Sequence, residues 1–152
     1  MNTPGERLAP FNVELKDVSM SLRVFQNYLQ GIIDRDWDQV RPTLAENVHR
    51  EGYDGPRDST DGREPYLAFL DRTMTPLQGF GYDVHRVTTA DDGKVGLIEV
   101  TSTYTEDGDT FGYRMCYVIT VNDDDLIDNI EIYWKTPDRR LRNDTVHDRY
   151  GK

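Results

Sequence analysis

Apolar residues recur every three or four positions along the segment that follows residue 17. This set consists of Val18, Leu22, Phe25, Leu29, Ile32 and Ile33. The spacing places these side chains on one face and predicts an amphipathic α-helix. Asp36 is followed three residues later by Gln39, a capping-box pattern that predicts the start of a second helix. Pro42 breaks or kinks this second segment, because proline lacks the backbone N–H that a helix interior uses.

The next part of the chain predicts a short strand over residues 48–53 and a third helix over residues 63–74. Pro65 fits the first turn of that helix, where a missing N–H has little cost. The segment between the two elements reads YDGPRDSTDG. Its content of Gly, Pro and Asp predicts a loop.

After Pro76 the apolar period changes from three or four residues to two. Four strands are predicted, over residues 82–89, 95–105, 111–121 and 126–135. The pairs Asp92-Gly93 and Asp107-Gly108 predict tight turns between them. Helices followed by a strand meander indicate an α+β fold. Two strands of about eleven residues exceed the usual length. Long strands favour a curved antiparallel sheet that wraps the helices and leaves a cavity beside the first helix.

The composition narrows the class of protein. The chain has 152 residues, 36% of them hydrophobic, and a formal net charge of -10. These values predict one folded domain over residues 18–136, a flexible arm over 1–17 and a charged, mobile tail over 137–152. The acidic balance argues against a nucleic-acid partner. The absence of an apolar run of about 20 residues argues against a membrane span. Cys116 is the single cysteine, which excludes a disulfide within the chain. We expect a cytoplasmic protein.

Alternation along residues 111–121 predicts which side chains could carry chemistry. One face holds Phe111, Tyr113, Met115, Tyr117, Ile119 and Val121. This face is the more apolar one, so we expect it to point inward and to bring two phenols into the interior. Glu99 alternates with Val95 and Leu97, which predicts a carboxyl on an apolar face with a raised pKa. His85 could transfer protons near neutral pH.

At this point the chain resembles a known family. The helix–helix–strand–helix–meander order, with YLQGIIDRDWDQVRPTLAENV early and GREPYLAFL after the Gly/Asp loop, is similar to the nuclear-transport-factor-2-like superfamily. Within it the closest resemblance is to the SnoaL-like and ketosteroid-isomerase-like branch, over about residues 18–136. The resemblance implies a cone-shaped curved antiparallel sheet wrapped around three N-terminal helices, with an internal pocket.

The resemblance also implies roles for individual residues. Ketosteroid isomerases have an oxyanion-binding tyrosine in a segment like NYLQGIIDRDWD, and Tyr28 falls on it. Their second oxyanion donor is a protonated aspartate, and Tyr117 stands near that position. Their general base lies at the end of the first strand, where this chain has Gly52. Glu51 and Asp54 are the displaced candidates for that base.

Two other branches give a second comparison. Bile-acid dehydratase uses Tyr, Asp and His as its acid/base set, and Tyr28 and His85 match two of them. Ile33 occupies the aspartate position. Limonene-epoxide-hydrolase relatives need an Arg-x-Asp pair on a strand, where this chain has Glu99-x-Thr101, so that chemistry is not expected. The side chains expected to line the pocket are Phe25, Ile32, Tyr53, Phe69, Tyr113, Met115, Ile119, Ile132 and Trp134.

These observations favour a cofactor-free, metal-free acid/base enzyme that acts on a hydrophobic, ring-containing small molecule. Its catalytic candidates are Tyr28, Tyr117, His85, Glu51, Asp54 and Glu99. The alternative is a non-catalytic carrier, sensor or accessory protein on the same fold, because a fold does not determine a function. The resemblance also suggests a homodimer, formed through an outer sheet face that carries Tyr133, Val118 and Val100.

Overall fold

The structure is a computed structural model that describes residues 7–11, 13–14, 19–52 and 54–135. The tail 137–152, most of the arm 1–17 and Tyr53 lie outside these residues. The described part of the arm forms a small hairpin of β1 (Arg7–Leu8) and β2 (Val13–Glu14). Phe11 in this hairpin is buried, with 1% of its surface exposed.

The domain begins with the helices α1 (Met20–Asp34) and α2 (Trp37–Val40), followed by the 3₁₀ turn η2 (Arg41–Thr43). A further helix, α3 (Arg63–Met74), comes later in the chain. The Ser19 side chain caps α1 by accepting a hydrogen bond from the backbone N–H of Leu22 at 3.1 Å. The Asp36 side chain caps α2 through the N–H of Gln39, as the capping pattern predicts.

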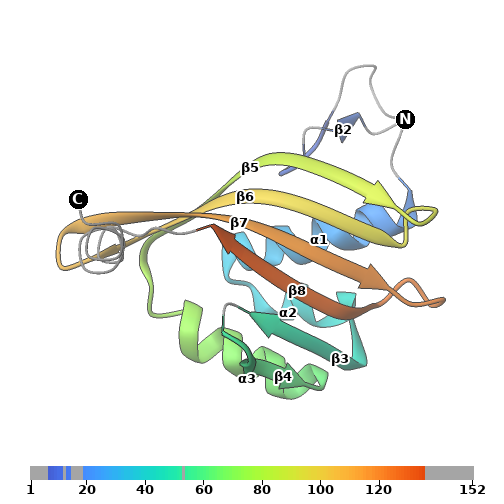
Figure 1. The fold of residues 1–152 in the computed structure, drawn as a ribbon, viewed down its shortest axis with the longest axis horizontal. Helices are drawn as coiled ribbons and strands as arrows, with labels where there is room; N and C mark the ends of the chain where they lie inside the picture. The colour runs from blue at the N-terminus through green and yellow to red at the C-terminus, as the bar shows by residue number, and fades with distance from the viewer. Residues whose placement is uncertain (1–6, 12, 15–18, 53, 136–152) are drawn as a thin grey trace, which may run out of the picture.

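A six-stranded sheet covers the helices (Figure 1). Its strands are β3 (Leu44–Gly52), β4 (Gly55–Asp61), β5 (Gln78–Ala90), β6 (Val95–Glu106), β7 (Asp109–Val121) and β8 (Ile127–Lys135). They lie in the order β4-β3-β8-β7-β6-β5, and every neighbouring pair is antiparallel except the parallel pair β3–β8. The fold is therefore α+β with a curved, mostly antiparallel sheet, as the sequence predicts.

The strand β4 is the main difference from the predicted elements. Residues 55–61 fall in the segment expected to be a loop, yet they pair with β3. The pairing shifts register between Glu51 and Gly52: Glu51 is opposite Ser59, whereas Gly52 is opposite Gly55. Backbone hydrogen bonding with a neighbouring strand overrides the turn preference of Gly, Pro and Asp, which propensity alone cannot reveal.

The inner face of the sheet forms the core together with α1. Along β7 the alternating set from Phe111 to Val121 is buried, as predicted. On β6 the prediction has the wrong phase, because Gly96, Ile98 and Val100 are buried and Glu99 lies on the other face. Val100 has 0% exposed surface, so it does not belong to the outer face.

Candidate active site

A cavity of about 660 Å³ lies between α3, the start of β5 and the inner face of the sheet. Its lining is mostly aromatic and aliphatic. The lining residues are Arg50, Asp58, Tyr66, Phe69, Leu70, Thr73, Met74, Leu77, Phe80, Tyr82, Ser102, Tyr104, Tyr113, Met115, Tyr117, Ile132 and Trp134. An apolar cavity with a few convergent polar groups is the usual form of a small-molecule site.

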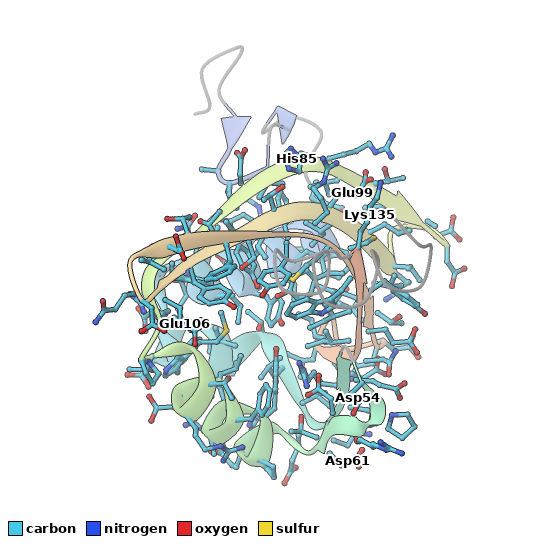
Figure 2. The ribbon with its side chains drawn as sticks, turned by 60° about the vertical axis from the view of Figure 1, so that its left-hand side comes forward. Asp54, Asp61, His85, Glu99, Glu106 and Lys135 are labelled. Atoms are coloured by element: carbon cyan, nitrogen blue, oxygen red, sulfur yellow. The ribbon has the colours of Figure 1, made fainter. Side chains whose placement is uncertain are left out.

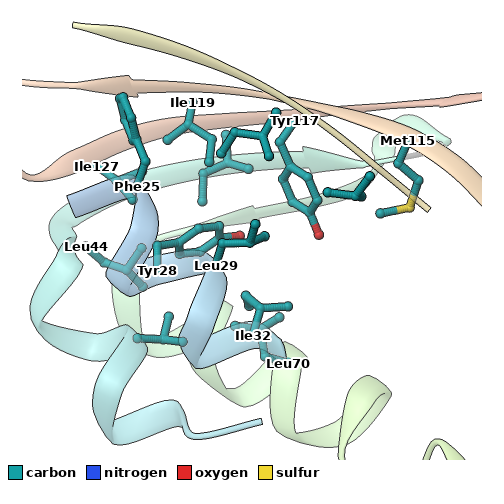
Figure 3. Packing of buried hydrophobic residues seen from close by; sticks show 14 of the residues in the cluster. Phe25, Tyr28, Leu29, Ile32, Leu44, Leu70, Met115, Tyr117, Ile119 and Ile127 are labelled. Carbon is teal, nitrogen blue, oxygen red and sulfur yellow. The ribbon is translucent and has the colours of Figure 1, made fainter. Parts of the chain in front are cut away.

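Two hydrogen-bonded pairs of phenols lie at this cavity, and three of the four residues line it. The Tyr28 hydroxyl on α1 lies 2.5 Å from the Tyr66 hydroxyl on α3. The Tyr82 hydroxyl on β5 lies 2.5 Å from the Tyr117 hydroxyl on β7. The two pairs are adjacent, since the rings of Tyr28 and Tyr117 meet edge to face with centroids 6.3 Å apart. Figure 3 shows these two rings close together between α1 and the sheet.

Burial keeps these four hydroxyls protonated. It raises the pKa of Tyr66 to about 12, although the hydrogen bond with Tyr28 opposes the shift. Burial also raises the pKa of Tyr28, Tyr82 and Tyr117, because an ionised phenolate would lose its hydration inside the protein. The four groups are therefore hydrogen-bond donors across the physiological pH range.

An ion pair between Arg50 and Asp58 lies at the same cavity. Arg50 on β3 has 5% of its surface exposed. Its Nη1 donates to the backbone oxygen of Asp58 at 3.0 Å and to Oδ1 of the same residue at 2.5 Å. The guanidinium carbon lies 4.4 Å from the centre of the Phe69 ring. The pairing with a carboxylate and the contact with an aromatic ring both stabilise a charge that burial would otherwise disfavour.

Several of the predicted residues lie at this cavity. Phe69, Tyr113, Met115, Tyr117, Ile132 and Trp134 line it. Tyr28 has no part in the lining and lies behind Tyr66, its hydrogen-bond partner. Phe25, Ile32 and Ile119 are instead buried in the packed core. Alternation and helical period show which face of an element is buried, but not where along the element the packing opens into a cavity.

His85 and Glu99 lie outside the cavity, on the outer side of the sheet (Figure 2). His85 Nε2 is 2.6 Å from Thr101 Oγ1. Glu99 forms an exposed ion pair with Arg86, and this hydrogen bond lowers the pKa of Glu99. The expected raised pKa is therefore wrong, because the phase of the alternation on β6 is reversed.

The carboxylates expected near the end of the first strand are also outside the cavity. Glu51 alternates with the inward-facing Arg50 and lies 3.6 Å from His49 Nε2. Asp54 is exposed at the turn before β4 (Figure 2). Gly52 has no side chain, and a Cβ at this position would collide with Oδ2 of Asp58 and with Nη2 of Arg50. The Asp58 carboxylate thus occupies the space beside Gly52.

The predicted set lacks several polar residues of the site, among them Arg50, Asp58, Tyr66 and Tyr82. Alternation along β3 contains a signal for Arg50, which shares a face with Val48 and Gly52. Tyr66 lies on the same side of the predicted third helix as Phe69 and Leu70. Asp58 has no such signal, because its orientation depends on the register shift between β3 and β4.

Two wider properties follow from the described residues. Within them, no helix has the length and apolar character needed to cross a membrane. In the same residues, no three His, Cys, Asp or Glu side chains come together as ligands for a metal ion.

Known structures share this fold. A candidate ketosteroid isomerase from Kribbella flavida DSM 17836 is 22% identical, with a TM-score of 0.65 over 80% of this chain and 82% of its own. A Mycobacterium tuberculosis protein in complex with estradiol-17beta-hemisuccinate is 18% identical, with a TM-score of 0.67 over 78% and 95%. A candidate SnoaL-like polyketide cyclase from Shewanella denitrificans OS-217 is 8% identical, with a TM-score of 0.68 over 86% and 99%.

The search of curated proteins finds no match to the sequence. The model of the SnoaL-like domain family, in contrast, matches residues 25–129. That range includes most of α1, all of α3, the strands β3 to β7 and both hydrogen-bonded pairs of tyrosines. The chain therefore belongs to the SnoaL-like family and has the nuclear-transport-factor-2-like fold.

Proposed function

We propose that the chain binds a hydrophobic, ring-containing small molecule, such as a polyketide or a steroid-like compound, and acts on it as a cofactor-free acid/base enzyme. The reaction classes that fit are isomerisation, cyclisation and dehydration. One observation carries the proposal: two hydrogen-bonded pairs of protonated phenols lie at a mostly apolar cavity, and Tyr66, Tyr82 and Tyr117 of these pairs line it. Two related structures agree with this substrate class: one is a complex with a steroid derivative and the other is a candidate polyketide cyclase.

In the proposed reaction, a proton leaves a carbon next to a carbonyl group and the carbonyl oxygen gains negative charge. Tyr66 and Tyr117 line the cavity and donate hydrogen bonds to that oxygen. Tyr28 acts as a positioning residue: by donating to the Tyr66 oxygen, it leaves the Tyr66 proton for the substrate. Such donors stabilise the transition state most strongly where water is excluded.

The test uses decalone, a bicyclic ketone, as the substrate probe in deuterated buffer. Mass spectrometry measures deuterium uptake at the carbons beside the carbonyl. We expect the protein to accelerate uptake, and Tyr66→Phe and Tyr117→Phe to slow it by about 100- to 1,000-fold each, the usual effect of removing one oxyanion donor. Tyr133→Phe is the matched control, because Tyr133 is 60% exposed on the outer face.

Equal uptake rates in Tyr66→Phe, Tyr117→Phe and Tyr133→Phe would contradict the assigned donors. Binding of estradiol-17beta-hemisuccinate, followed by calorimetry, shows separately whether each variant keeps an intact cavity. A variant that folds and binds but loses uptake has lost chemistry rather than structure.

A non-catalytic binding protein is the second candidate. It is favoured by the positions of His85, Glu99, Glu51 and Asp54, which all lie away from the cavity lining. The phenols would then recognise an oxygen of the ligand without a proton transfer. In that case estradiol-17beta-hemisuccinate binds, and deuterium uptake by decalone matches the rate in protein-free buffer.

A further inference from the structure

The proposed function needs a group that accepts the proton, and the cavity contains one carboxylate. Among the described residues that line it, Asp58 is the sole Asp or Glu, and Arg50 is the sole cation. The other acidic candidates, Glu51, Asp54 and Glu99, lie outside it. The inference below rests on the proposed acid/base function and assigns its missing base.

The strand pairing determines where Asp58 points. Glu51 is opposite Ser59 and Gly52 is opposite Gly55, so residues 56–58 of β4 have no register partner among the described residues of β3. Such a bulge re-aims the side chains of the bulged strand. Asp58 then turns towards β3 and fills the space beside Gly52. Glycine is required at position 52 because any side chain there would displace the carboxylate.

The two oxygens of the Asp58 carboxylate have different environments. Oδ1 accepts a hydrogen bond from Arg50 Nη1 at 2.5 Å. Oδ2 accepts no hydrogen bond from any residue that the structure describes, and the Asp58 side chain keeps 27% of its surface exposed. Arg50 therefore holds one oxygen in place, while the other is free to take a proton.

The Asp58 carboxylate and the tyrosine hydroxyl donors belong to the lining of the same cavity. The positive charge of Arg50 lowers the pKa of Tyr28, Tyr66 and Tyr82, although the burial of these phenols raises it by more. Tyr66, Tyr82 and Tyr117 line the cavity together with Asp58. A ring-shaped ligand can thus contact a carboxylate at one edge and hydroxyl donors at another.

We propose that Asp58 is the catalytic base of this cavity and that Arg50 is its positioning residue. Oδ2 of Asp58 takes a proton from the carbon beside the carbonyl. The electron pair of the broken C–H bond forms a C=C bond, and the carbonyl oxygen becomes an enolate oxygen held by the tyrosine hydroxyls. The protonated carboxyl then returns the proton to a carbon of the same molecule, so no further reactant is needed.

The test again follows deuterium uptake by decalone, with Asp58→Asn as the main variant. Asparagine keeps the size of the side chain and an oxygen for Arg50 but cannot take up a proton. We expect uptake to fall by at least 100-fold while estradiol-17beta-hemisuccinate still binds within a few-fold of its original affinity. Asp61→Asn is the matched control, because Asp61 lies on the same strand with an 83% exposed side chain.

A second variant, Gly52→Ala, keeps both charged residues and displaces the Asp58 carboxylate and the Arg50 guanidinium through the new Cβ. We expect it to slow uptake as well, with a smaller effect than Asp58→Asn.

Uptake by Asp58→Asn at the rate of Asp61→Asn would overturn the assignment of the base and leave the proposed enzyme intact. Absence of uptake in the unmodified protein is a different result, because it overturns the proposed enzyme together with its base. Loss of estradiol-17beta-hemisuccinate binding in a folded Asp58→Asn would also overturn the assignment of Asp58 as the base, because the residue would then act in ligand binding.

Discussion

At the scale of single residues, the buried tyrosines are the most informative feature of the molecule. A hydroxyl removed from water without a partner has a cost of about 1 to 3 kcal/mol. The chain avoids this cost by pairing Tyr28 with Tyr66 and Tyr82 with Tyr117. Each pair connects elements far apart in the sequence, and so the pairs join α1 to α3 and β5 to β7.

The same burial predicts that the protein loses stability in alkali. The pKa of Tyr66 is raised to about 12 in the folded chain, against about 10 in an unfolded chain. The folded state is therefore stabilised fully below about pH 10, and this contribution disappears as the pH rises towards about 12. For Tyr66 alone we expect a loss on the order of 2 to 3 kcal/mol. Urea unfolding across this pH range measures it.

Tyr66→Phe is the control for this prediction. The variant lacks one titrating hydroxyl, so its free energy of unfolding should fall less steeply with pH than that of the unmodified chain. An identical slope in both proteins would show that Tyr66 does not change its protonation behaviour on folding.

At the scale of elements, α1 packs against the sheet through a strand position without a side chain. A Cβ on Gly96 of β6 would lie 2.8 Å from ring atoms of Phe25 on α1. Phe25 has 0% exposed surface and cannot move aside into solvent. The glycine therefore sets how closely the helix approaches the strand, and with it the width of the core beside the cavity.

Gly96→Ala should lower the free energy of unfolding by about 1 to 3 kcal/mol, the usual effect of overpacking a core. Gly112→Ala is the matched control on the neighbouring strand β7, because a Cβ there would have its nearest contact at 3.8 Å. We expect the control to be neutral or slightly stabilising, since glycine weakens strand interiors. Chemical denaturation compares the two, and equal stabilities would contradict the packing.

At the edge of the sheet, the strand β4 determines which charged residues lie at the cavity. The pair β3–β4 brings Arg50 and Asp58 together across a register shift, although they are eight residues apart in sequence. The same pairing leaves Glu51 on the outer side of β3. A strand segment that resembles a loop in composition thus supplies the carboxylate of the cavity.

At the scale of the whole molecule, the chain is strongly charged, whereas its cavity is mostly apolar. The chain carries a formal net charge of -10. Self-repulsion of this kind opposes the compact state and is screened by salt. The cavity, in contrast, is mostly apolar and contains one neutralised ion pair. The surface charge therefore affects stability, while it has little part in recognising an uncharged ligand.

The negative net charge predicts a melting temperature that rises by a few degrees between about 0.02 and 0.2 M sodium chloride, because salt screens the repulsion between the acidic side chains. Differential scanning calorimetry measures the change. Asp124→Asn is the comparison variant: Asp124 is exposed beside Asp123 in the turn before β8, and removing its charge should reduce the salt dependence. A melting temperature that falls with salt would show that attractive surface pairs dominate instead.

The sequence by itself determined the order of the helices and of the strands other than β1, β2 and β4, together with the α+β class and the family. Helical period, capping residues and two Asp-Gly turns are local signals, and each acts within a few residues. They place α3 correctly and assign the inner face of β7 from Phe111 to Val121. The resemblance over the same segments led to the SnoaL-like family, which the family match confirms.

Only the tertiary structure decided which side chains meet. Local alternation shows that two faces differ, but the phase on β6 depends on how the sheet lies over α1, and so Glu99 faces outward. The strand β4 exists because β3 offers it hydrogen-bond partners. The partners of the tyrosines and of Arg50 come from contacts across the fold. Such contacts depend on register and packing between distant segments, which no local pattern encodes.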